Sequence, residues 1–368
     1  MKIELKENAK IIMSNPDSYH NYFAWPTAAR LQNGKIAVVA SGFRLSHVCP
    51  FGKTVISYSE DNGESYTLPA PVIDTVLDDR DGGILAYGDK NVIVTSFNNT
   101  PDFQRERIVN GSGFSKYCPM KQYRYAYLDS MGEEWEKYHG SLFRISQDGG
   151  VTFGPVFKSP ITSPHGPSEL NDGTLLWVGT NFGIINRGEH QKPRISAYRI
   201  NNDGSSEHIG DIANFTNDKG EVVEGCEPYA IQTQSGRILC HIRGQIHGDS
   251  AITLYQSYSD DQGKTWSKPQ RILPENGGAP SHILKTKSGL LICTYSCRVK
   301  PFGIKAMVSR NDGESWEDLG YLYINDHSAD LGYPSTVELG DNSFLTVFYA
   351  HPNGENFAVI MQQKWNLI

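Results

Sequence analysis

Six stretches of the chain share one pattern, in which a short polar turn is followed by a run of apolar residues. A turn that contains Gly, Asn or Asp before a β-branched or aromatic run predicts a β-hairpin. Apart from one longer gap between the second and third stretches, the period between such turns is about 50 to 65 residues, which suits one four-stranded sheet per repeat, as in a β-propeller blade. The six stretches are LQNGKIAVVA from Leu31, YGDKNVIVTSF from Tyr87, LNDGTLLWVG from Leu170, TQSGRILCHI from Thr233, TKSGLLICTY from Thr286 and LGDNSFLTVFY from Leu339.

A second, shorter repeat reads Ser-x-Asp-x-Gly-x-Thr-Trp and begins at Ser59, Ser146, Ser259 and Ser309. The fourth copy has Asn311 in place of the aspartate. Asp and Ser side chains can bond nearby backbone N–H groups, and Gly supplies a positive φ. We therefore interpret these boxes as locks of outer hairpins, remote from any chemistry, and expect the closing aromatic residue to pin each hairpin to its own sheet.

Two segments depart from the repeat. Residues 121–140 carry apolar side chains at helical spacing and end in Gly140, a plausible C-cap, so we expect a helical insertion over one rim. The N-terminal KIELKENAKIIMS is a candidate outer strand for the last repeat. Such a strand would close the ring and leave no sheet edge bare.

Composition and local motifs argue against several kinds of partner. The net charge is −7, whereas nucleic-acid-binding domains are usually basic, so we expect no nucleic-acid partner. The six cysteines include no CxxC pair, and the histidines show no metal-binding spacing, so we expect no metal and no cofactor. The N-terminus lacks the apolar core of a signal peptide. No apolar run reaches the roughly 18 residues of a membrane span. We expect a cytoplasmic protein without a membrane partner; a signal peptide removed before this chain begins would leave the same sequence.

The boxes and the six-unit register together resemble the sialidase (neuraminidase) superfamily, from about Tyr22 to Trp365. The resemblance implies an all-β fold, a six-bladed β-propeller formed by a single domain over residues 1–368. It also implies a pocket on the propeller axis, lined by the ends of the innermost strands. The corresponding segments are rich in charged and aromatic residues: NYFAWP (21–26), LDDRDGG (77–83), TSPHGP (162–167), GCEPYA (225–230), GAPSH (278–282) and DLGYPS (330–335).

The family's chemistry follows from its substrate, a sugar whose anomeric carbon bears a carboxylate. A neutral tyrosine is not repelled by that group, provided that a glutamate takes its proton. Arginines bind the carboxylate with their forked donors. By resemblance, GYPSTVEL places Tyr333 as the nucleophile, EPYAIQTQSGRILCHIR supplies Glu227 as its base and Arg243 as a clamp, and CRVKPFGIKAMVSRNDGESW supplies Arg298.

Two family features are missing. The first-blade arginine is replaced in FAWPTAA by Ala24 and Trp25, and the segment GFRLSHVCPFGK, where the acid/base aspartate is expected, has no carboxylate. That segment offers Arg44, His47 and Lys53, and a histidine can act as acid or base near neutral pH. The second unit offers Asp79, Arg80 and Asp81 as replacements, and His165 and His282 also stand at blade mouths. We therefore assign Tyr333, Glu227, His47 and Asp81 to catalysis, and Arg44, Arg80, His165, Arg243, His282 and Arg298 to substrate binding, all within one pocket.

The leading hypothesis is a sialidase-like glycoside hydrolase that removes a terminal acidic sugar from a glycan. One alternative is a carbohydrate-binding propeller without catalysis, although binding alone does not need a base beside a phenol. Another is a lyase or glycosidase specific for uronic acids, in which His47 and Tyr333 serve as base and acid. A lyase would reveal itself by the absorbance of a new double bond.

Overall fold

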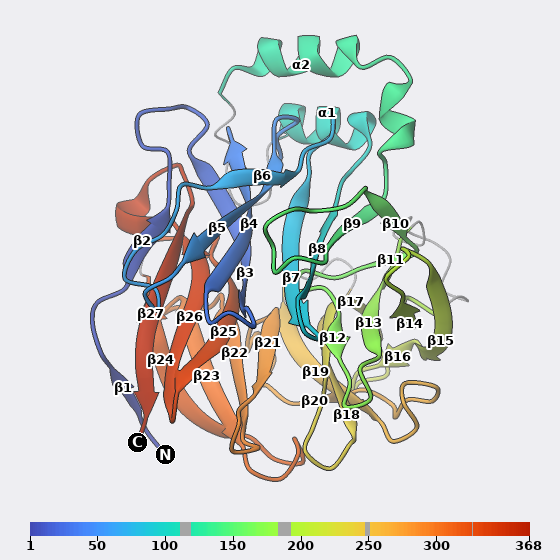
Figure 1. The fold of residues 1–368 in the computed structure, drawn as a ribbon, viewed down its shortest axis with the longest axis vertical. Coiled ribbons are helices and arrows are strands. Elements are labelled where there is room, and N and C mark those ends of the chain that lie inside the picture. The colour runs from blue at the N-terminus through green and yellow to red at the C-terminus, as the bar shows by residue number, and fades with distance from the viewer. Residues whose placement is uncertain (111–118, 183–192, 247–250, 326) are drawn as a thin grey trace.

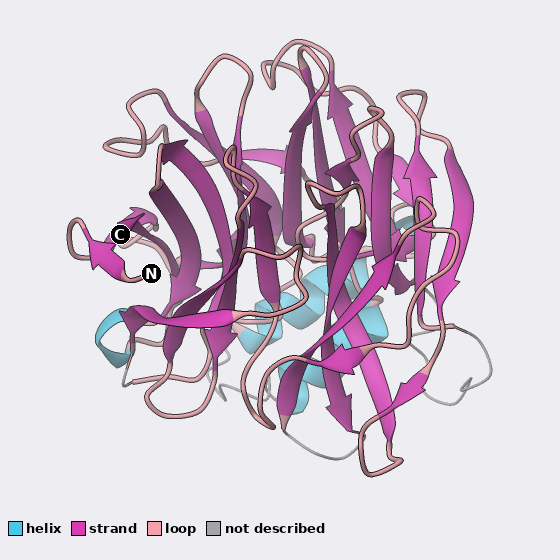
Figure 2. Ribbon diagram, turned by 90° about the horizontal axis from the view of Figure 1, so that it is seen from below, coloured by secondary structure: helices cyan, strands magenta, loops and turns pink. Residues whose placement is uncertain are grey.

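The computed structural model describes residues 1–110, 119–182, 193–246, 251–325 and 327–368. Its strands form six antiparallel sheets around one axis, which confirms the expected six-bladed propeller (Figures 1 and 2). We number these sheets as blades 1 to 6 from the first complete sheet of the chain. In blades 1, 2, 5 and 6 the first strand in sequence is innermost, and the next strands follow outward. Inner strands are in contact between blades 6 and 1, 1 and 2, 3 and 4, 4 and 5, and 5 and 6.

The first three blades occupy the N-terminal half. Blade 1 contains β3 (Tyr22–Arg30), β4 (Ile36–Arg44), β5 (Lys53–Ser59) and β6 (Ala70–Ile73). Blade 2 contains β7 (Arg80–Tyr87), β8 (Asn91–Phe97), β9 (Ser141–Ser146) and β10 (Phe157–Ser159). Blade 3 has its inner edge in two short pieces, β11 (Ile161–Thr162) and β12 (Ser168–Glu169), followed by β13 (Leu175–Asn181), β14 (Ile195–Ile200) and β15 (Ser206–Ile212).

The remaining blades follow in the same direction around the ring. Blade 4 contains β16 (Phe215–Thr216), β17 (Val222–Gln232), β18 (Ile238–Ile246), β19 (Ile252–Ser259) and β20 (Gln270–Arg271). Blade 5 contains β21 (Ser281–Lys285), β22 (Leu291–Cys297), β23 (Gly303–Ser309) and β24 (Glu317–Ile324). Blade 6 contains β25 (Gly332–Gly340), β26 (Ser343–Ala350) and β27 (Val359–Leu367), with a 3₁₀ turn, Pro352–Gly354, before the last strand.

The N-terminal segment closes the ring, as expected. Strands β1 (Ile3–Leu5) and β2 (Lys10–Met13) both pair with β27, and Ile3 lies opposite Leu367. The two chain ends therefore lie side by side (Figures 1 and 2). Apolar clusters fill the space between neighbouring blades, including one that joins blade 1 to blade 6. Burial of this surface, at about 25 cal/mol per Å², is the main force that holds the blades together.

The helical insertion has two helices where one was expected. Helix α2 (Lys121–Ser130) lies in the predicted segment but ends before Gly132, whose φ of 56° stops the helix, and a 3₁₀ turn (Glu134–Lys137) follows. Helix α1 (Pro101–Asn110) was not predicted, although Thr100 caps it through a hydrogen bond from the N–H of Phe103. Both helices cover the rim of blades 1 and 2 (Figure 1).

The four boxes lie between the last two strands of blades 1, 2, 4 and 5, away from the axis, as predicted. In the third box Asp261 accepts hydrogen bonds from the N–H and hydroxyl of Thr265. The expectation that the closing aromatic pins its own sheet is wrong for two boxes. Tyr66 donates to Gln362 of blade 6, and Trp316 donates to Gln256 of blade 4. These boxes therefore join each blade to the preceding one.

Candidate functional site

Four of the inner strands, β3, β7, β17 and β25, share one irregularity. In each, one extra residue is inserted opposite the second strand, which is a β-bulge. The bulged residue has a positive φ: 54° at Trp25, 52° at Asp81, 49° at Glu227 and 50° at Tyr333. This conformation costs a non-glycine residue about 1–2 kcal/mol, and such strain concentrates at functional sites.

The residue after each bulge suits the irregularity. It is proline in blades 1, 4 and 6, and Gly82 in blade 2. Proline has no N–H to contribute to a ladder, so a bulge sacrifices no hydrogen bond at that position. The bulges of blades 2, 4 and 6 bring Asp81, Glu227 and Tyr333 to one end of the axis. We use the term axial site for the cluster formed by Arg80, Asp81, Glu227, Arg243, Arg298 and Tyr333.

The centre of the axial site is a hydrogen-bonded pair. The hydroxyl of Tyr333 donates to Oε1 of Glu227 over 2.6 Å, and Nη1 of Arg243 donates to the same oxygen over 2.9 Å. Tyr333 is only 5% exposed, whereas the side chains of Glu227 and Arg243 are 20% and 18% exposed. Oε2 of Glu227 is buried without a hydrogen-bond partner. The structure thus brings together the predicted nucleophile, base and first clamp.

The electrostatics keep the Tyr333 phenol protonated at rest. Burial, together with the negative charges of Glu227 and Asp81, holds the pKa of Tyr333 well above its usual value, although Arg243 and Arg298 oppose the shift. The guanidinium carbon of Arg298 lies 5.9 Å from the centre of the Tyr333 ring. Two cations from blades 4 and 5 therefore act on the phenol, and the Glu227 carboxylate is the acceptor of its proton in the hydrogen bond.

Blade 2 contributes a second charged pair. Nε of Arg80 lies 3.7 Å from Oδ1 of Asp81, and the Arg80 guanidinium stacks 4.2 Å from the centre of the Trp25 ring. Burial raises the pKa of Asp81 to about 7; Arg80 lowers that pKa and the charge of Glu227 raises it. Near neutral pH, Asp81 therefore exists partly as the acid, which is the form that can donate a proton.

His47 lies in a buried polar network beside the axial site. Its Nδ1 is 3.1 Å from the Tyr22 hydroxyl and 3.6 Å from Oδ2 of Asp330, and its ring meets the Trp25 ring edge-on at 4.9 Å. Burial lowers the pKa of His47 below its ordinary value despite the opposing charge of Asp330. Sequence reasoning missed Tyr22 and Asp330, although both lie in segments singled out as blade mouths.

Arg44 is a correction. Its side chain is completely buried and forms a bidentate ion pair with the equally buried Asp78, at 2.5 and 2.9 Å. Nη2 of Arg44 also donates a hydrogen bond to the backbone carbonyl of His47 at 2.8 Å. Because no part of Arg44 reaches the surface, the prediction that it binds substrate is wrong; it supports the loop that carries His47. Asp79 is likewise internal, bonded to Thr75.

His165 and His282 are also corrected. They are 2% and 6% exposed, and their rings meet edge-on at 5.2 Å in the interior of the propeller. Nδ1 of His165 contacts the Thr27 hydroxyl at 3.0 Å, and Nδ1 of His282 accepts the N–H of Thr336. Burial lowers the pKa of His282 to about 3 and that of His165 well below its usual value. The structure thus replaces the predicted substrate contacts with neutral packing along the axis.

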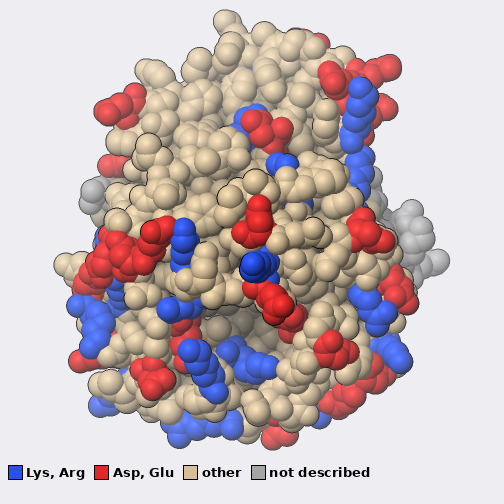
Figure 3. All heavy atoms as spheres, viewed as in Figure 1, with Lys and Arg blue, Asp and Glu red and all other residues tan. Residues whose placement is uncertain are grey.

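We searched the described parts of the chain for a metal site and for a membrane-spanning helix. In residues 1–110, 119–182, 193–246, 251–325 and 327–368, no group of three or more His, Cys, Asp or Glu is arranged to hold a metal ion. Within those same ranges, no helix is long and apolar enough to cross a membrane. Lys, Arg, Asp and Glu side chains are interspersed over the face shown in Figure 3, so a charge patch does not mark a binding site there.

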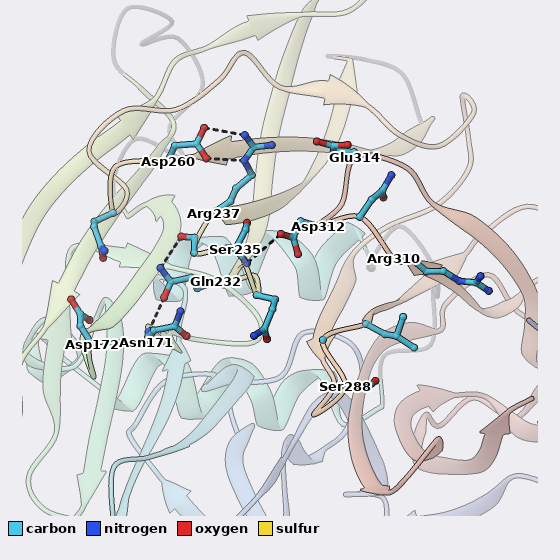
Figure 4. A pocket seen from close by; sticks show the side chains of 16 residues that line it. Asn171, Asp172, Gln232, Ser235, Arg237, Asp260, Ser288, Arg310, Asp312 and Glu314 are labelled. Atoms are coloured by element: carbon cyan, nitrogen blue, oxygen red, sulfur yellow. Dashed lines mark hydrogen bonds and ion pairs between the residues drawn. The ribbon is translucent and has the colours of Figure 1, made fainter.

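A broad groove of about 1250 Å³ lies at the opposite ends of the strands of blades 3, 4 and 5 (Figure 4). Hairpin turns and two boxes line it, and its side chains bond one another. Arg237 pairs with Asp260 at 2.7 Å, and Asp312 accepts the N–H of Ser235. Among the described residues that line the groove there is no aromatic ring on which a sugar could stack. These contacts hold the turns of the three blades together.

Comparisons with known proteins agree with the fold. A family model described as a BNR repeat-like domain matches residues 121–347. No curated protein matches the chain by sequence. A protein of unknown function from Dyadobacter fermentans has a similar structure, with 19% identity, a TM-score of 0.74, and coverage of 100% of this chain and 99% of that one.

Two glycosidases share the fold at lower identity. The NanB sialidase of Streptococcus pneumoniae is 13% identical, with a TM-score of 0.64 and coverage of 100% of this chain and 71% of that one. An alpha-L-arabinanase of Penicillium chrysogenum is also 13% identical, with a TM-score of 0.60 and coverage of 100% and 99%. The same propeller therefore occurs in enzymes that act on different sugars, so the residues of the axial site have to carry the functional argument.

Proposed function

The chain belongs to the family of BNR repeat-like domains, and from that premise we propose that it is a sialidase-like glycoside hydrolase that removes a terminal acidic sugar. The observation that carries the proposal is the 2.6 Å hydrogen bond between Tyr333 and Glu227, with Arg243 on the same carboxylate. A phenol is a weak nucleophile unless an adjacent base takes its proton as the new bond forms. A protein that only binds a sugar has no need for that arrangement.

In the first step, Oη of Tyr333 attacks the anomeric carbon, and its proton passes to Glu227. The bond to the leaving-group oxygen breaks, and Asp81 in its acid form gives that oxygen a proton. The raised pKa of Asp81, about 7, suits this donation. In the second step, the Asp81 carboxylate accepts a proton from water, which attacks the glycosyl-tyrosine and releases the sugar, while Glu227 returns the proton to Tyr333.

The acidic group of the substrate is matched by three arginines. Arg243 bonds the Glu227 carboxylate beside Tyr333, Arg298 lies 5.9 Å from the centre of the Tyr333 ring, and Arg80 stacks over the Trp25 ring. Arginine binds a carboxylate through two parallel hydrogen bonds. A neutral phenol beside this cluster is not repelled by a substrate carboxylate, whereas an ionised carboxylate nucleophile would be.

The test is hydrolysis of aryl glycosides of N-acetylneuraminate, glucuronate and arabinofuranose, with the released phenol measured by absorbance. We expect turnover of an acidic glycoside by the wild-type protein and none by Tyr333→Phe. Turnover of the arabinofuranoside alone would contradict the acidic substrate. Binding without turnover would favour a lectin, and a product with a new double bond would favour a lyase.

A further inference from the structure

Two buried serines, on the second strands of blades 1 and 5, bond the backbone of the following blade at the axial site. Oγ of Ser41, in β4, accepts a hydrogen bond from the N–H of Asp81 at 2.9 Å. Oγ of Ser296, in β22, accepts one from the N–H of Tyr333 at 3.2 Å. Both serines are completely buried. The donors of these two bonds are the residues that act as acid and nucleophile in the steps above.

The β-bulges explain why these two N–H groups need an acceptor outside their own sheet. In blade 2 the register passes from Arg80 directly to Gly83, and in blade 6 it passes from Gly332 to Ser335. The extra residue of a bulge is left out of the hydrogen-bond ladder. A buried N–H without any partner is costly, so the bulge depends on an acceptor from elsewhere in the molecule. The serine of the preceding blade is that acceptor.

The contact at the nucleophile also depends on a glycine. A Cβ atom at Gly332, whose φ is 130°, would lie 2.1 Å from Oγ of Ser296. A larger residue at this position would therefore push the hydroxyl away from the N–H of Tyr333. The two strands that meet here, β22 and β25, are in contact, as are β4 and β7 around Ser41. Both hydrogen bonds thus cross the seam between two neighbouring blades.

The conformation that the serines hold is a strained one. The φ angles are 52° at Asp81 and 50° at Tyr333, in a region that residues with a side chain rarely adopt. A bulge in this conformation re-aims the side chain of its extra residue. A return to the extended conformation would point that side chain in another direction. The acceptor that stabilises the bulge therefore also decides where the side chain points.

We propose that Ser41 and Ser296 are positioning residues: by accepting the N–H of a bulged residue in the next blade, Ser41 aims the carboxyl group of Asp81, and Ser296 the hydroxyl of Tyr333, at the bound sugar. Each serine acts through the residue whose N–H it accepts and does not touch the sugar itself. The inference deepens the proposed function and rests on it for the roles of acid and nucleophile.

Crystal structures of Ser41→Ala and Ser296→Ala test the positioning without any substrate. In Ser296→Ala, the Tyr333 hydroxyl should move beyond hydrogen-bond reach of Glu227, which is about 3.2 Å, while Asp81 stays in place. In Ser41→Ala, Asp81 should move away from Arg80 while the bond between Tyr333 and Glu227 remains. Native geometry at both bulges in both variants would overturn the proposal. This result stands even if no glycoside is hydrolysed and the proposed function fails.

The kinetic test compares two leaving groups, with the 4-nitrophenyl and methyl glycosides of N-acetylneuraminate as substrates. Nitrophenolate departs without a proton, whereas the alcohol of the methyl glycoside needs one from the acid. In Ser41→Ala, kcat/KM should therefore fall about tenfold or more for the methyl glycoside and change little for the nitrophenyl glycoside. In Ser296→Ala, kcat/KM should fall about tenfold or more for both, because the nucleophile attacks both. Equal losses for the two substrates in Ser41→Ala would overturn its assignment to the acid.

Ser259→Ala is the matched control for stability. Ser259 is also buried, and its Oγ accepts the N–H groups of Asp261 and Gly263 in a box remote from the axis. The thermal unfolding midpoint should fall in all three serine variants, whereas kcat/KM for both glycosides should stay at the wild-type value in Ser259→Ala alone. A comparable loss of activity in Ser259→Ala would show that lowered stability explains the effect, and would overturn the proposal.

Discussion

The hydroxyl of Tyr333 and the carboxylate of Glu227 are hydrogen-bonded at 2.6 Å although 106 positions separate them in the chain. Each residue is the extra residue of a β-bulge, and each is followed by proline. The two blades thus use the same backbone device to aim a polar side chain at the axis. The pairing depends on backbone geometry, so the roles of the two side chains can be tested without disturbing the fold.

The first prediction concerns Tyr333→Phe. Hydrolysis should fall by on the order of 10³-fold or more, because only the nucleophilic oxygen is lost. The thermal unfolding midpoint should change little, since the ring keeps its place. Tyr349→Phe is the matched control, a buried tyrosine whose hydroxyl bonds Asp330. Equal activity in the two variants would rule out tyrosine as the nucleophile.

The second prediction concerns Glu227→Gln. The amide preserves the shape of the side chain but cannot take the Tyr333 proton, so kcat should fall by about 10²–10⁴-fold. Substrate binding should weaken little, because Arg243 and Arg298 remain. Steady-state kinetics will separate the two effects. Glu221→Gln, in an exposed turn, is the control, and a Glu227→Gln enzyme with normal kcat would exclude the base role.

The third prediction is a pH dependence from Asp81. As the acid, Asp81 must be protonated, so kcat/KM should fall as the pH rises through about 7, the raised pKa of this buried carboxyl. Asp81→Asn should lose most activity and also this alkaline limb. The limb should persist in Asp261→Asn, whose carboxyl lies in a distant box. A pH profile that is unchanged in Asp81→Asn would assign the limb to another group.

The raised pKa of Asp81 also makes the free energy of unfolding depend on pH. The pKa of Asp81 in the folded protein lies above the usual value of about 4, so the folded state binds the proton more tightly between about pH 4 and 7. The free energy of unfolding should therefore decrease as the pH rises across that window. Urea unfolding at several pH values should show a smaller decrease in Asp81→Asn. An equal or steeper decrease in the variant would contradict the raised pKa.

The fourth prediction separates two neighbouring arginines. Arg44→Met removes the bidentate partner of the buried Asp78 carboxylate, which then keeps only a 3.8 Å contact with Arg80 and the N–H of Cys49, and should destabilise the protein by about 3 kcal/mol. Arg80→Met, at the axial site, should cost less stability and instead raise KM for an acidic glycoside. Urea unfolding and steady-state kinetics measure the two effects. The reverse pattern would return Arg44 to the substrate and make Arg80 structural.

Much of the fold could be predicted because it repeats. The six turn-and-strand units and the four boxes each predict a local hairpin, because the residues that form a hairpin lie close together in the sequence. Helix α1 escaped notice because its sequence, PDFQRERIVN, has little amphipathic pattern, and only its Thr-Pro-Asp start marks it. The partner of each box aromatic could not be predicted, since Gln362 and Gln256 belong to other blades.

Only some residues of the candidate site could be predicted from the sequence. The family's motifs mark Tyr333, Glu227 and Arg243, and these three side chains form one hydrogen-bonded cluster. Arg44 and Arg80 look alike in sequence, but Asp78 forms a close bidentate pair with Arg44 and only a 3.8 Å contact with Arg80. Asp330 was passed over because nothing local shows that Tyr22 and His351 converge on it from distant segments. Such three-dimensional partners decide which polar residues face the ligand.

The central claim, that Tyr333 attacks the sugar, can be tested most directly by trapping the intermediate. A glycosyl fluoride of the acidic sugar, with a second fluorine beside the anomeric carbon, should react with Tyr333 and lose fluoride, because the electron-withdrawing substituent slows hydrolysis of the adduct. Mass spectrometry of the digested protein should then show one glycosyl group on the peptide that contains Tyr333, and none in Tyr333→Phe. A glycosyl group on Glu227 or Asp81 instead, or turnover of the reagent with no adduct on any residue, would contradict the account.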